Sequence, residues 1–349
     1  MTRPIELVRA YIAADVPVLL WGPPGVGKTA ALRAEAEDAG ALVVTLIGST
    51  LDPIDVGGYL LPDRGQVVCS PPPWAQEIRG ALDESKRVWL FLDELGCALP
   101  AVQAALLRVV HERRVGPVDL SGCSVVAASN RGDTAADGGE LPAAQANRWA
   151  HVEWPPDPDG WIAGTLSGWG RGYSAIAETT IACSVAEWVR RQPAALLAVP
   201  DGADASGPWP SPRSWTHGIR AAAMAPTMAR ALMAGLIGAA AAAEWHTYHV
   251  ARDLPDPEDL LAGRACLPDR GDRIAACLGS VVAAAGLARP DREARVAAAW
   301  RLLSGVRPDV ARLAGSALGD LDPDLIPEEA VALGQRIISL RDRTSAVAG

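Results

Sequence analysis

The chain has 349 residues, of which 49% are apolar, and it is too long to fold around one compact core. Its formal net charge is −9, and the acidic excess is spread along the chain rather than gathered in a tail. This balance argues against a general nucleic-acid binder, which usually carries a basic excess, although a local basic stripe stays open.

Residues 1–156 alternate short apolar runs with helical patterns. The short runs are rich in β-branched residues, which is typical of buried parallel strands joined by helical crossovers. Strands are predicted at residues 18–21, 41–47, 88–92, 123–128 and 151–154, and helices at residues 28–39, 74–85 and 100–112. The first segment is therefore predicted to be an α/β domain built on a five-stranded parallel sheet.

Strand signals disappear after residue 156. Residues 200–214 form a loop rich in Pro, Gly, Asp and Ser, and residues 252–256 read RDLPD, which indicates a boundary. Helices are predicted at residues 161–166, 185–191, 214–225, 228–250, 257–263, 273–287, 292–303, 308–318 and 327–340. We expect an α-helical domain at 157–255, followed by a helical extension at 256–349.

A glycine-rich motif lies between the first predicted strand and the helix that follows it. Residues 22–29 read GPPGVGKT and fit the pattern GxxxxGK followed by Ser or Thr. Glycines let the backbone turn its N–H groups onto phosphate oxygens, and the helix N-terminus favours negative charge. Lys28 can reach the β- and γ-phosphates, and the Thr29 hydroxyl can bind Mg²⁺. The predicted nucleotide-binding residues are Gly22, Pro23, Pro24, Gly25, Val26, Gly27, Lys28, Thr29 and Ala30.

Two carboxylates follow the third predicted strand. Residues 87–94 read RVWLFLDE, so Asp93 and Glu94 lie at the carboxyl edge of the sheet, beside the glycine-rich motif. Asp93 is predicted to hold Mg²⁺, directly or through water, and Glu94 to orient and polarise the attacking water. The acidic pair favours hydrolysis over phosphoryl transfer to a metabolite.

The fourth predicted strand ends in an amide. Asn130 follows the run SVVAAS and can hydrogen-bond both the γ-phosphate and the attacking water. In isolation, an Asn at this place is a common turn residue. The two motifs before it favour the catalytic interpretation.

Taken in order, these motifs resemble those of AAA+ ATPases, and more closely those of the MoxR-like clade. The closest stretch is DELGCALPAVQAALLRVVHERRVG, at residues 93–116, and ELPAAQANRWAHVEW at residues 140–154 resembles the segment that carries the arginine finger. The resemblance covers about residues 15–260 and implies a P-loop NTPase fold with an all-α lid.

The resemblance also implies two further catalytic residues. Arg148 matches the arginine finger, which in this family reaches the γ-phosphate held by the neighbouring subunit. Arg213 matches the second sensor on the helical lid, although it is predicted to lie in a Pro-rich loop. A finger of this kind is typically worth about 10³–10⁵ in rate, so an isolated subunit is expected to be nearly inert.

A hairpin and a second short turn are predicted inside the first segment. Asp52 and Pro53 can start a helix that Gly57 and Gly58 end, and YLLPDRGQVVC at residues 59–69 then reads as a hairpin. A second short turn is predicted at residues 115–117. In MoxR-like proteins and the similar magnesium-chelatase subunits a hairpin projects toward the ring centre, and the alternative is that both are ordinary surface turns.

These features predict an ATPase that uses ATP and Mg²⁺ and assembles into a ring, with a hexamer expected. The resemblance implies chaperone-like remodelling of a protein client and a von Willebrand factor A-domain protein as partner. Two alternatives stay open, which are a motor acting on nucleic acid and a slow, nucleotide-gated assembly scaffold. The intact Glu94, Asn130 and Arg148 argue against the scaffold.

A cytoplasmic location is expected from the cysteines and from the apolar runs. The six cysteines lack a CxxC pair, which is typical of buried thiols in a reducing compartment. The first 17 residues lack the apolar core of a signal peptide, and the longest apolar run, residues 231–243, is too short to span a bilayer.

Overall fold

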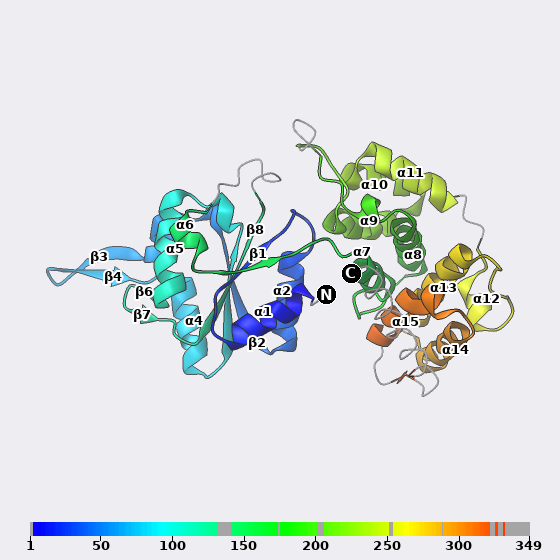
Figure 1. Ribbon diagram of the computed structural model, residues 1–349, viewed down its shortest axis with the longest axis horizontal. Coiled ribbons are helices and arrows are strands. Elements are labelled where there is room, and N and C mark those ends of the chain that lie inside the picture. Colours follow the sequence, from blue (N-terminus) through cyan, green and yellow to red (C-terminus); the bar gives the residue numbers. More distant parts are fainter. Residues whose placement is uncertain are drawn as a thin grey trace. The chain divides into compact units, whose positions relative to one another are not determined.

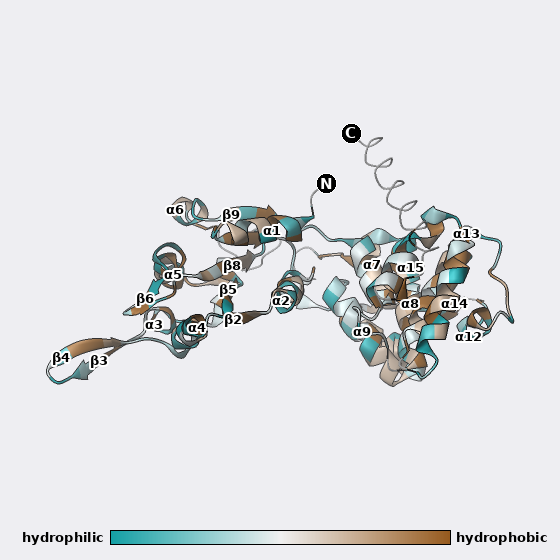
Figure 2. Cartoon of the chain, turned by 90° about the horizontal axis from the view of Figure 1, so that it is seen from below, coloured by the Kyte–Doolittle hydropathy of each residue, from teal (hydrophilic) through white to brown (hydrophobic). Residues whose placement is uncertain are grey.

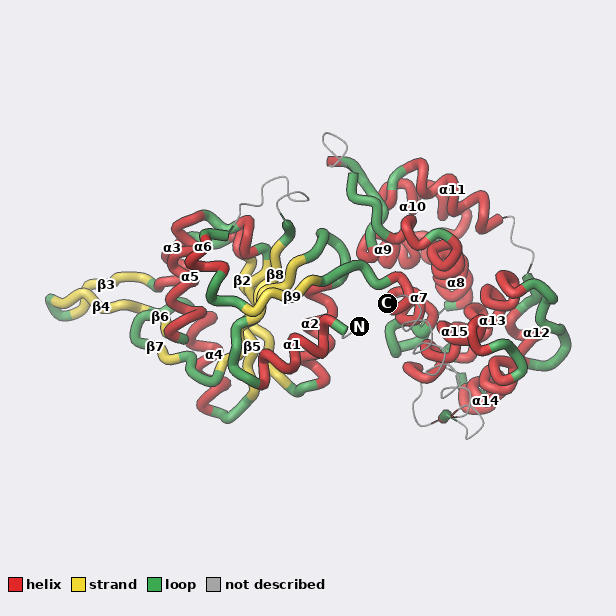
Figure 3. Tube along the Cα trace, in the orientation of Figure 1, coloured by secondary structure: helices red, strands yellow, loops and turns green. Residues whose placement is uncertain are grey.

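The computed structural model divides the chain into two compact units, Met1–Pro156 and Asp157–Gly349, which are described separately below. The structure describes residues 3–131, 141–173, 175–200, 206–250, 254–287, 289–321, 325–326 and 331. The first unit contains the strands of the central sheet and the second is helical (Figure 1, Figure 3). The predicted division of the helical part at residue 256 stays a prediction.

A five-stranded sheet in the order β2-β5-β8-β1-β9 forms the centre of the first unit. All four neighbouring pairs are parallel, with Val18 of β1 opposite Val126 of β8 and Ala150 of β9. The strands are β1 (Val18–Trp21), β2 (Ala41–Ile47), β5 (Arg87–Asp93), β8 (Cys123–Ser129) and β9 (Ala150–Glu153). The predicted fold class, an α/β protein with a five-stranded parallel sheet and a helical region after it, is confirmed.

Both faces of this sheet are buried, which explains the nearly continuous apolar strands. Successive side chains point to opposite faces, so Leu19 joins one core cluster while Val18 and Leu20 join another. The helices α1 (Pro4–Ala13) and α2 (Lys28–Asp38) supply Val8 and Leu32 to the second cluster. The helices that cover the other face are α3 (Pro53–Gly57), α4 (Pro73–Asp83) and α5 (Pro100–Glu112).

Two hairpins interrupt the α/β alternation, the first where a hairpin was predicted and the second where a short turn was predicted. The first pairs β3 (Tyr59–Asp63) with β4 (Gln66–Ser70) and extends away from the rest of its unit (Figure 1). Arg64 and Gly65 between the strands both have positive φ, which suits a two-residue hairpin turn. The second pairs β6 (Arg114–Val115) with β7 (Val118–Asp119). The remaining short helices of the first unit are η1 (Gly48–Thr50), η2 (Leu95–Cys97) and α6 (Ala143–Ala146).

The second unit packs its helices around one apolar core. The largest fully buried side chains there include Trp215 and Trp245, and the core draws on residues from both sides of position 256. The helices are α7 (Pro158–Leu166), α8 (Ile176–Arg191), η3 (Pro193–Leu196), α9 (Pro212–Met224), η5 (Pro226–Met228), α10 (Ala229–Ile237), α11 (Ala239–Val250), α12 (Pro257–Leu261), α13 (Gly271–Ala285), α14 (Arg292–Ser304) and α15 (Pro308–Leu321).

The prediction of one continuous helix over residues 228–250 is wrong. This segment is divided into α10 and α11 at Gly238, whose φ is +85°. A side chain at this position would lie 2.9 Å from the Pro208 carbonyl oxygen, so both the backbone and the space require glycine. Most of the helix predicted at residues 327–340 lies outside the described residues, as do residues 201–205 of the predicted loop and residues 252–253 of the predicted boundary.

Among the described residues, no helix is long and apolar enough to cross a membrane. In the described part of the chain the six cysteines are not in disulfide bonds, and Cys123, Cys183 and Cys277 are buried. Burial raises the pKa of the Cys123 thiol to about 11, which keeps it protonated and unreactive at neutral pH.

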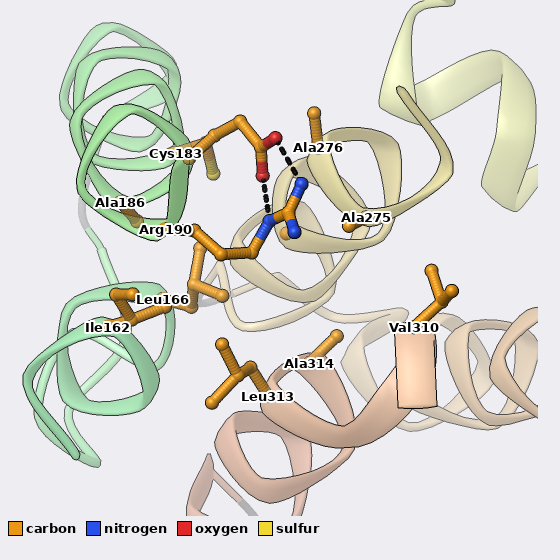
Figure 4. A pocket seen from close by; sticks show the side chains of 12 residues that line it. Ile162, Leu166, Cys183, Ala186, Arg190, Ala275, Ala276, Val310, Leu313 and Ala314 are labelled. Atoms are coloured by element: carbon orange, nitrogen blue, oxygen red, sulfur yellow. Dashed lines mark hydrogen bonds and ion pairs between the residues drawn. The ribbon is translucent and has the colours of Figure 1, made fainter. Parts of the chain in front are cut away.

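A small pocket lies in the second unit between α7, α8, α13 and α15. Its lining is mainly apolar, as Ile162, Leu166 and Leu313 illustrate in Figure 4. The Glu187 carboxylate at its side accepts hydrogen bonds from Arg190 Nε at 2.7 Å and Arg190 Nη2 at 2.6 Å. Arg191 Nε also donates to Glu187, at 3.1 Å, so the carboxylate is fully engaged by arginines of its own helix. We interpret the pocket as a gap in helix packing.

An ion pair between Glu258 of α12 and Arg295 of α14 gives the stability of the second unit a pH dependence. The two guanidinium N–H groups donate to the two carboxylate oxygens at 2.7 Å each, and these hydrogen bonds hold the pKa of Glu258 below its usual value. As pH falls below about 4.5, the Glu258 carboxylate is protonated in the unfolded chain before it is protonated in the folded protein. The stability that the ion pair contributes is therefore lost as pH falls. We expect Glu258→Gln to destabilise the unit by about 1–2 kcal/mol at pH 7, with a smaller gap at about pH 3.5.

Urea unfolding followed by circular dichroism at both pH values measures this gap. Glu293→Gln is the matched control, because Glu293 is exposed on α14 and carries the same charge. A gap between wild type and Glu258→Gln that stays constant or widens on acidification would contradict the expected sign.

Candidate functional site

The glycine-rich motif forms an open loop between β1 and α2, named here the phosphate loop (residues 22–29). Gly25 and Gly27 have φ of +77° and +97°, a region that favours glycine. No atom lies within 4 Å of the position a Cβ on Gly27 would take, so this side of the loop is open. Because α2 begins at Lys28, its first free N–H groups and its positive dipole end face an anion in the loop.

Lys28 is held inside this loop by oxygen acceptors. Its side chain is buried, and Nζ donates to the Gly22 carbonyl at 2.7 Å, the Pro23 carbonyl at 3.0 Å and Asn130 Oδ1 at 3.0 Å. A buried ammonium needs such acceptors, and phosphate oxygens are stronger ones. The contact places Asn130 at the phosphate loop, although 102 residues separate it from Lys28.

Thr29 and Asp93 bring two oxygen ligands together. Thr29 Oγ1 donates to Asp93 Oδ2 at 2.8 Å, so the hydroxyl and the carboxylate lie side by side at the sheet edge. Hard oxygen ligands of this kind suit Mg²⁺, which usually takes one or two protein groups together with phosphate oxygens and waters. The residues present therefore fit a magnesium ion bound with a nucleotide.

Glu94 lies directly after β5 in an unusual backbone conformation. Its φ of +55° and ψ of +37° are uncommon for a residue with a side chain, and such outliers occur at functional sites. Its carboxylate oxygen Oε2 accepts a hydrogen bond from Ser49 Oγ at 2.5 Å. Ser49 was missed by sequence reasoning, and the signal for it is a polar residue just past the carboxyl end of β2, at the same edge as Asp93 and Glu94.

The hydrogen bond from Ser49 is expected to restrain catalysis by Glu94. With Ser49→Ala the carboxylate loses the hydrogen bond that holds it at the end of β2 and is free to turn toward an attacking water, so we expect the basal ATPase rate to rise about two- to tenfold. A steady-state assay at saturating ATP measures this rate. Thr50→Ala is the control, because the Thr50 hydroxyl bonds to the Ile47 carbonyl instead of to Glu94. A lower rate in Ser49→Ala alone would mean that Ser49 positions Glu94 productively.

Arg148 is not brought to the phosphate loop of its own chain. It follows α6 and precedes β9, whose first residue, Ala150, pairs with Val18 at the amino end of β1. The phosphate loop instead follows Trp21, at the carboxyl end of the same strand, about 10 Å further along. The Arg148 side chain is exposed and donates to the Ala144 carbonyl. The hydrogen bond that this side chain makes is therefore to its own short helix and not to the nucleotide site of the same chain.

Arg213 belongs to the second unit and is the second residue of α9. The prediction that it lies in a loop is wrong, because Ser211 and Ser214 form a reciprocal capping box that starts the helix before Arg213. The Arg213 side chain is exposed. Its role as a second sensor stays a prediction.

The first unit thus combines a parallel α/β sheet, a glycine-rich phosphate loop and a Thr-Asp oxygen pair, which define a P-loop nucleotide-binding protein. Residues 18–137 match the sequence family described as "ATPase family associated with various cellular activities (AAA)". The chain therefore carries an AAA ATPase domain, and the prediction of an ATP hydrolase is confirmed. The matched range includes the phosphate loop, the acidic pair and Asn130.

Two solved structures of Thermotoga maritima RuvB are similar to the chain. A proline-to-glycine variant is 17% identical, covers 83% of this chain and 89% of its own, and gives a TM-score of 0.38. A lysine-to-arginine variant is 16% identical, covers 83% of this chain and 88% of its own, and gives a TM-score of 0.35. A likeness at this level carries no argument about function. Among curated proteins, none matches the sequence.

Proposed function

We propose that the protein is a ring-forming, MoxR-like AAA+ ATPase, assembled as a hexamer, that uses ATP hydrolysis to remodel or assemble a protein partner. The observation that carries this proposal is the division of the catalytic residues. Lys28, Thr29, Asp93, Glu94 and Asn130 gather at one edge of the sheet, whereas Arg148 lies at the other. A site that lacks its arginine in one chain is completed when the next subunit supplies it.

Each residue of the site has a distinct task in this proposal. The backbone N–H groups of the phosphate loop and Lys28 bind the phosphates, and Thr29 and Asp93 hold Mg²⁺, which neutralises phosphate charge when bound. Glu94 accepts a hydrogen bond from the attacking water and polarises it, and Asn130 orients the water against the γ-phosphate. Arg148 of the neighbouring subunit balances the charge that develops during transfer.

The β3–β4 hairpin supports a protein rather than a nucleic acid as the client. Its apolar side chains are open to solvent, with Leu60 72% and Val67 69% exposed, and Figure 2 shows hydrophobic colour along β4. Its other exposed apolar residues are Tyr59, Leu61 and Val68. Apolar groups exposed in this way favour contact with another protein surface.

The remaining parts of the proposal rest on the resemblance and on composition. The MoxR-like pattern implies a von Willebrand factor A-domain partner, and the cysteines and apolar runs of the sequence favour a cytoplasmic location. The net charge of −9 argues against a nucleic-acid motor, and turnover that DNA stimulates strongly would favour that alternative instead.

Mixing two inactive variants tests the shared site. Glu94→Gln chains keep a finger but lack the catalytic carboxylate, and Arg148→Ala chains keep the carboxylate but lack the finger. Each variant alone should be nearly inactive, and the mixture should regain part of the wild-type ATPase rate. The wild-type rate per subunit should also rise with protein concentration as rings assemble.

A mixture of Glu94→Gln with Lys28→Ala chains is the matched negative control. In such a ring no site combines an intact phosphate loop with an intact Glu94, so no activity should return. If the first mixture also stays inactive and the wild-type rate does not depend on concentration, Arg148 is not a finger and the ring proposal fails.

A further inference from the structure

Helix α6 has only four residues, yet Arg148 follows it by two positions. A helix this short is not stable by itself in water, so contacts with the rest of the unit must fix its place. Two separate sets of hydrogen bonds reach it. Both begin at residues next to the nucleotide site.

The first set connects α6 to the residue before the phosphate loop. Trp21 Nε1 donates to His151 Nδ1 at 2.7 Å, and His151 Nε2 lies 2.8 Å from the Ala146 carbonyl oxygen, at the end of α6. Since the indole N–H only donates and the carbonyl only accepts, Nδ1 is the acceptor and Nε2 carries the hydrogen. The Trp21 and His151 rings are also stacked, with centroids 6.0 Å apart, and the Arg131 guanidinium lies over Trp21 at 5.2 Å.

The second set connects α6 to the segment after Glu94. Gln145 of α6 is 1% exposed, and its Nε2 donates to the Gln103 carbonyl at 3.4 Å. The Gln103 side chain is also buried and donates to the Ala98 carbonyl at 3.1 Å and the Leu95 carbonyl at 3.5 Å. Leu95 follows Glu94 directly. The buried side chains of Gln103 and Gln145 therefore connect the acidic pair to α6.

The first set of hydrogen bonds begins at Trp21, beside the part of the phosphate loop that we expect nucleotide binding to change. Lys28 Nζ bonds to the Gly22 carbonyl, and an incoming phosphate competes for that ammonium. The Gly22 backbone has little room to move, because a Cβ there would lie 2.4 Å from the carbonyl oxygen of Trp154, the residue after β9. A change at this peptide is therefore passed to its neighbour Trp21 and to the strand that carries His151.

We propose that His151 and Gln145 are positioning residues for Arg148, through which the nucleotide site of one chain sets how its finger is presented to the next subunit. The proposal rests on the function proposed above for Arg148. It assigns to His151 a large effect on the neighbour's catalysis and a smaller one on the site of its own chain. Displacing a catalytic group by about 1 Å can cost about 10²-fold in rate, so a measurable loss is expected.

The test uses His151→Phe, which keeps a stacking ring and removes both hydrogen bonds. The substitution is added to only one of the two kinds of chain in the mixed rings, and each placement is measured separately. In Glu94→Gln chains, which act only as finger donors, it should lower the regained ATPase rate by about tenfold to a hundredfold. In Arg148→Ala chains, which act only as finger acceptors, it should change the regained rate by no more than about twofold. His111→Phe, on an exposed residue of α5, is the matched control in both placements.

Gln145→Met in the finger donor gives a second measurement from the buried side, with circular dichroism to check folding. An equal loss in both placements of His151→Phe would show a general structural role and overturn the proposal, as would no loss in either. If the parent mixture of Glu94→Gln and Arg148→Ala regains no activity, the function proposed for Arg148 fails first, and this inference falls with it.

Discussion

Replacement of Arg148 by alanine is expected to lower kcat for ATP hydrolysis by about 10³–10⁵-fold, with little change in the affinity for ATP. The reason is that the guanidinium is absent from its own chain's phosphate loop, where Lys28 and the loop amides are proposed to bind the nucleotide. An arginine that meets the γ-phosphate only across a subunit boundary acts mainly on the charge that develops during transfer, and so on kcat. Steady-state rates and equilibrium ATP binding, measured on assembled rings, separate the two effects.

Two variants control this measurement. Arg148→Lys keeps the charge but loses the planar fork of donors, so it should recover only a small part of the rate. Arg108→Ala removes an exposed arginine of α5 that pairs with Glu112 four residues away, and it should leave the rate within about twofold of wild type. A fall in ATP affinity equal to the fall in kcat would contradict the role of Arg148 as a finger.

The sequence was sufficient for the features that depend on local pattern. β1 and β2 have the predicted bounds, because a short apolar run rich in branched residues and bounded by turn residues has few other ways to bury its side chains. The phosphate loop was recognisable because its chemistry needs glycines and a Lys-Thr pair at fixed spacing. The carboxyl ends of parallel strands meet at one edge, which placed Asp93, Glu94 and Asn130 together before any contact was known.

Features that depend on distant contacts were not predictable in this way. Ser49 meets Glu94 across 45 residues, and Trp21 meets His151 across 130, with no spacing rule to connect them. The break at Gly238 depends on the nearby Pro208 carbonyl, whereas the local composition around it favours a continuous alanine-rich helix. In each case a tertiary contact decides between conformations that the local sequence allows equally.

Replacement of Glu94 by glutamine should lower kcat by about 10²–10⁴-fold while ATP binding is retained. An amide keeps the size of the side chain but is a poor proton acceptor, so the attacking water loses its polarising group. Lys28, Thr29 and Asp93 are untouched, and they are the residues proposed to hold the nucleotide and its magnesium ion. ATP binding in the absence of turnover, together with single-turnover hydrolysis, measures this separation.

Glu77→Gln, on an exposed residue of α4, controls for the loss of one negative charge and should hydrolyse ATP at the wild-type rate. Asp93→Asn provides the contrast, because weakening the carboxylate beside Thr29 should raise the Mg²⁺ concentration needed for activity. Glu94→Gln should leave that requirement unchanged, since its carboxylate bonds to Ser49 and lies outside the Thr-Asp pair. If Glu94→Gln shifted the magnesium requirement and kept its kcat, the tasks of the two carboxylates would be exchanged, and Asp93 would be the residue that polarises the water.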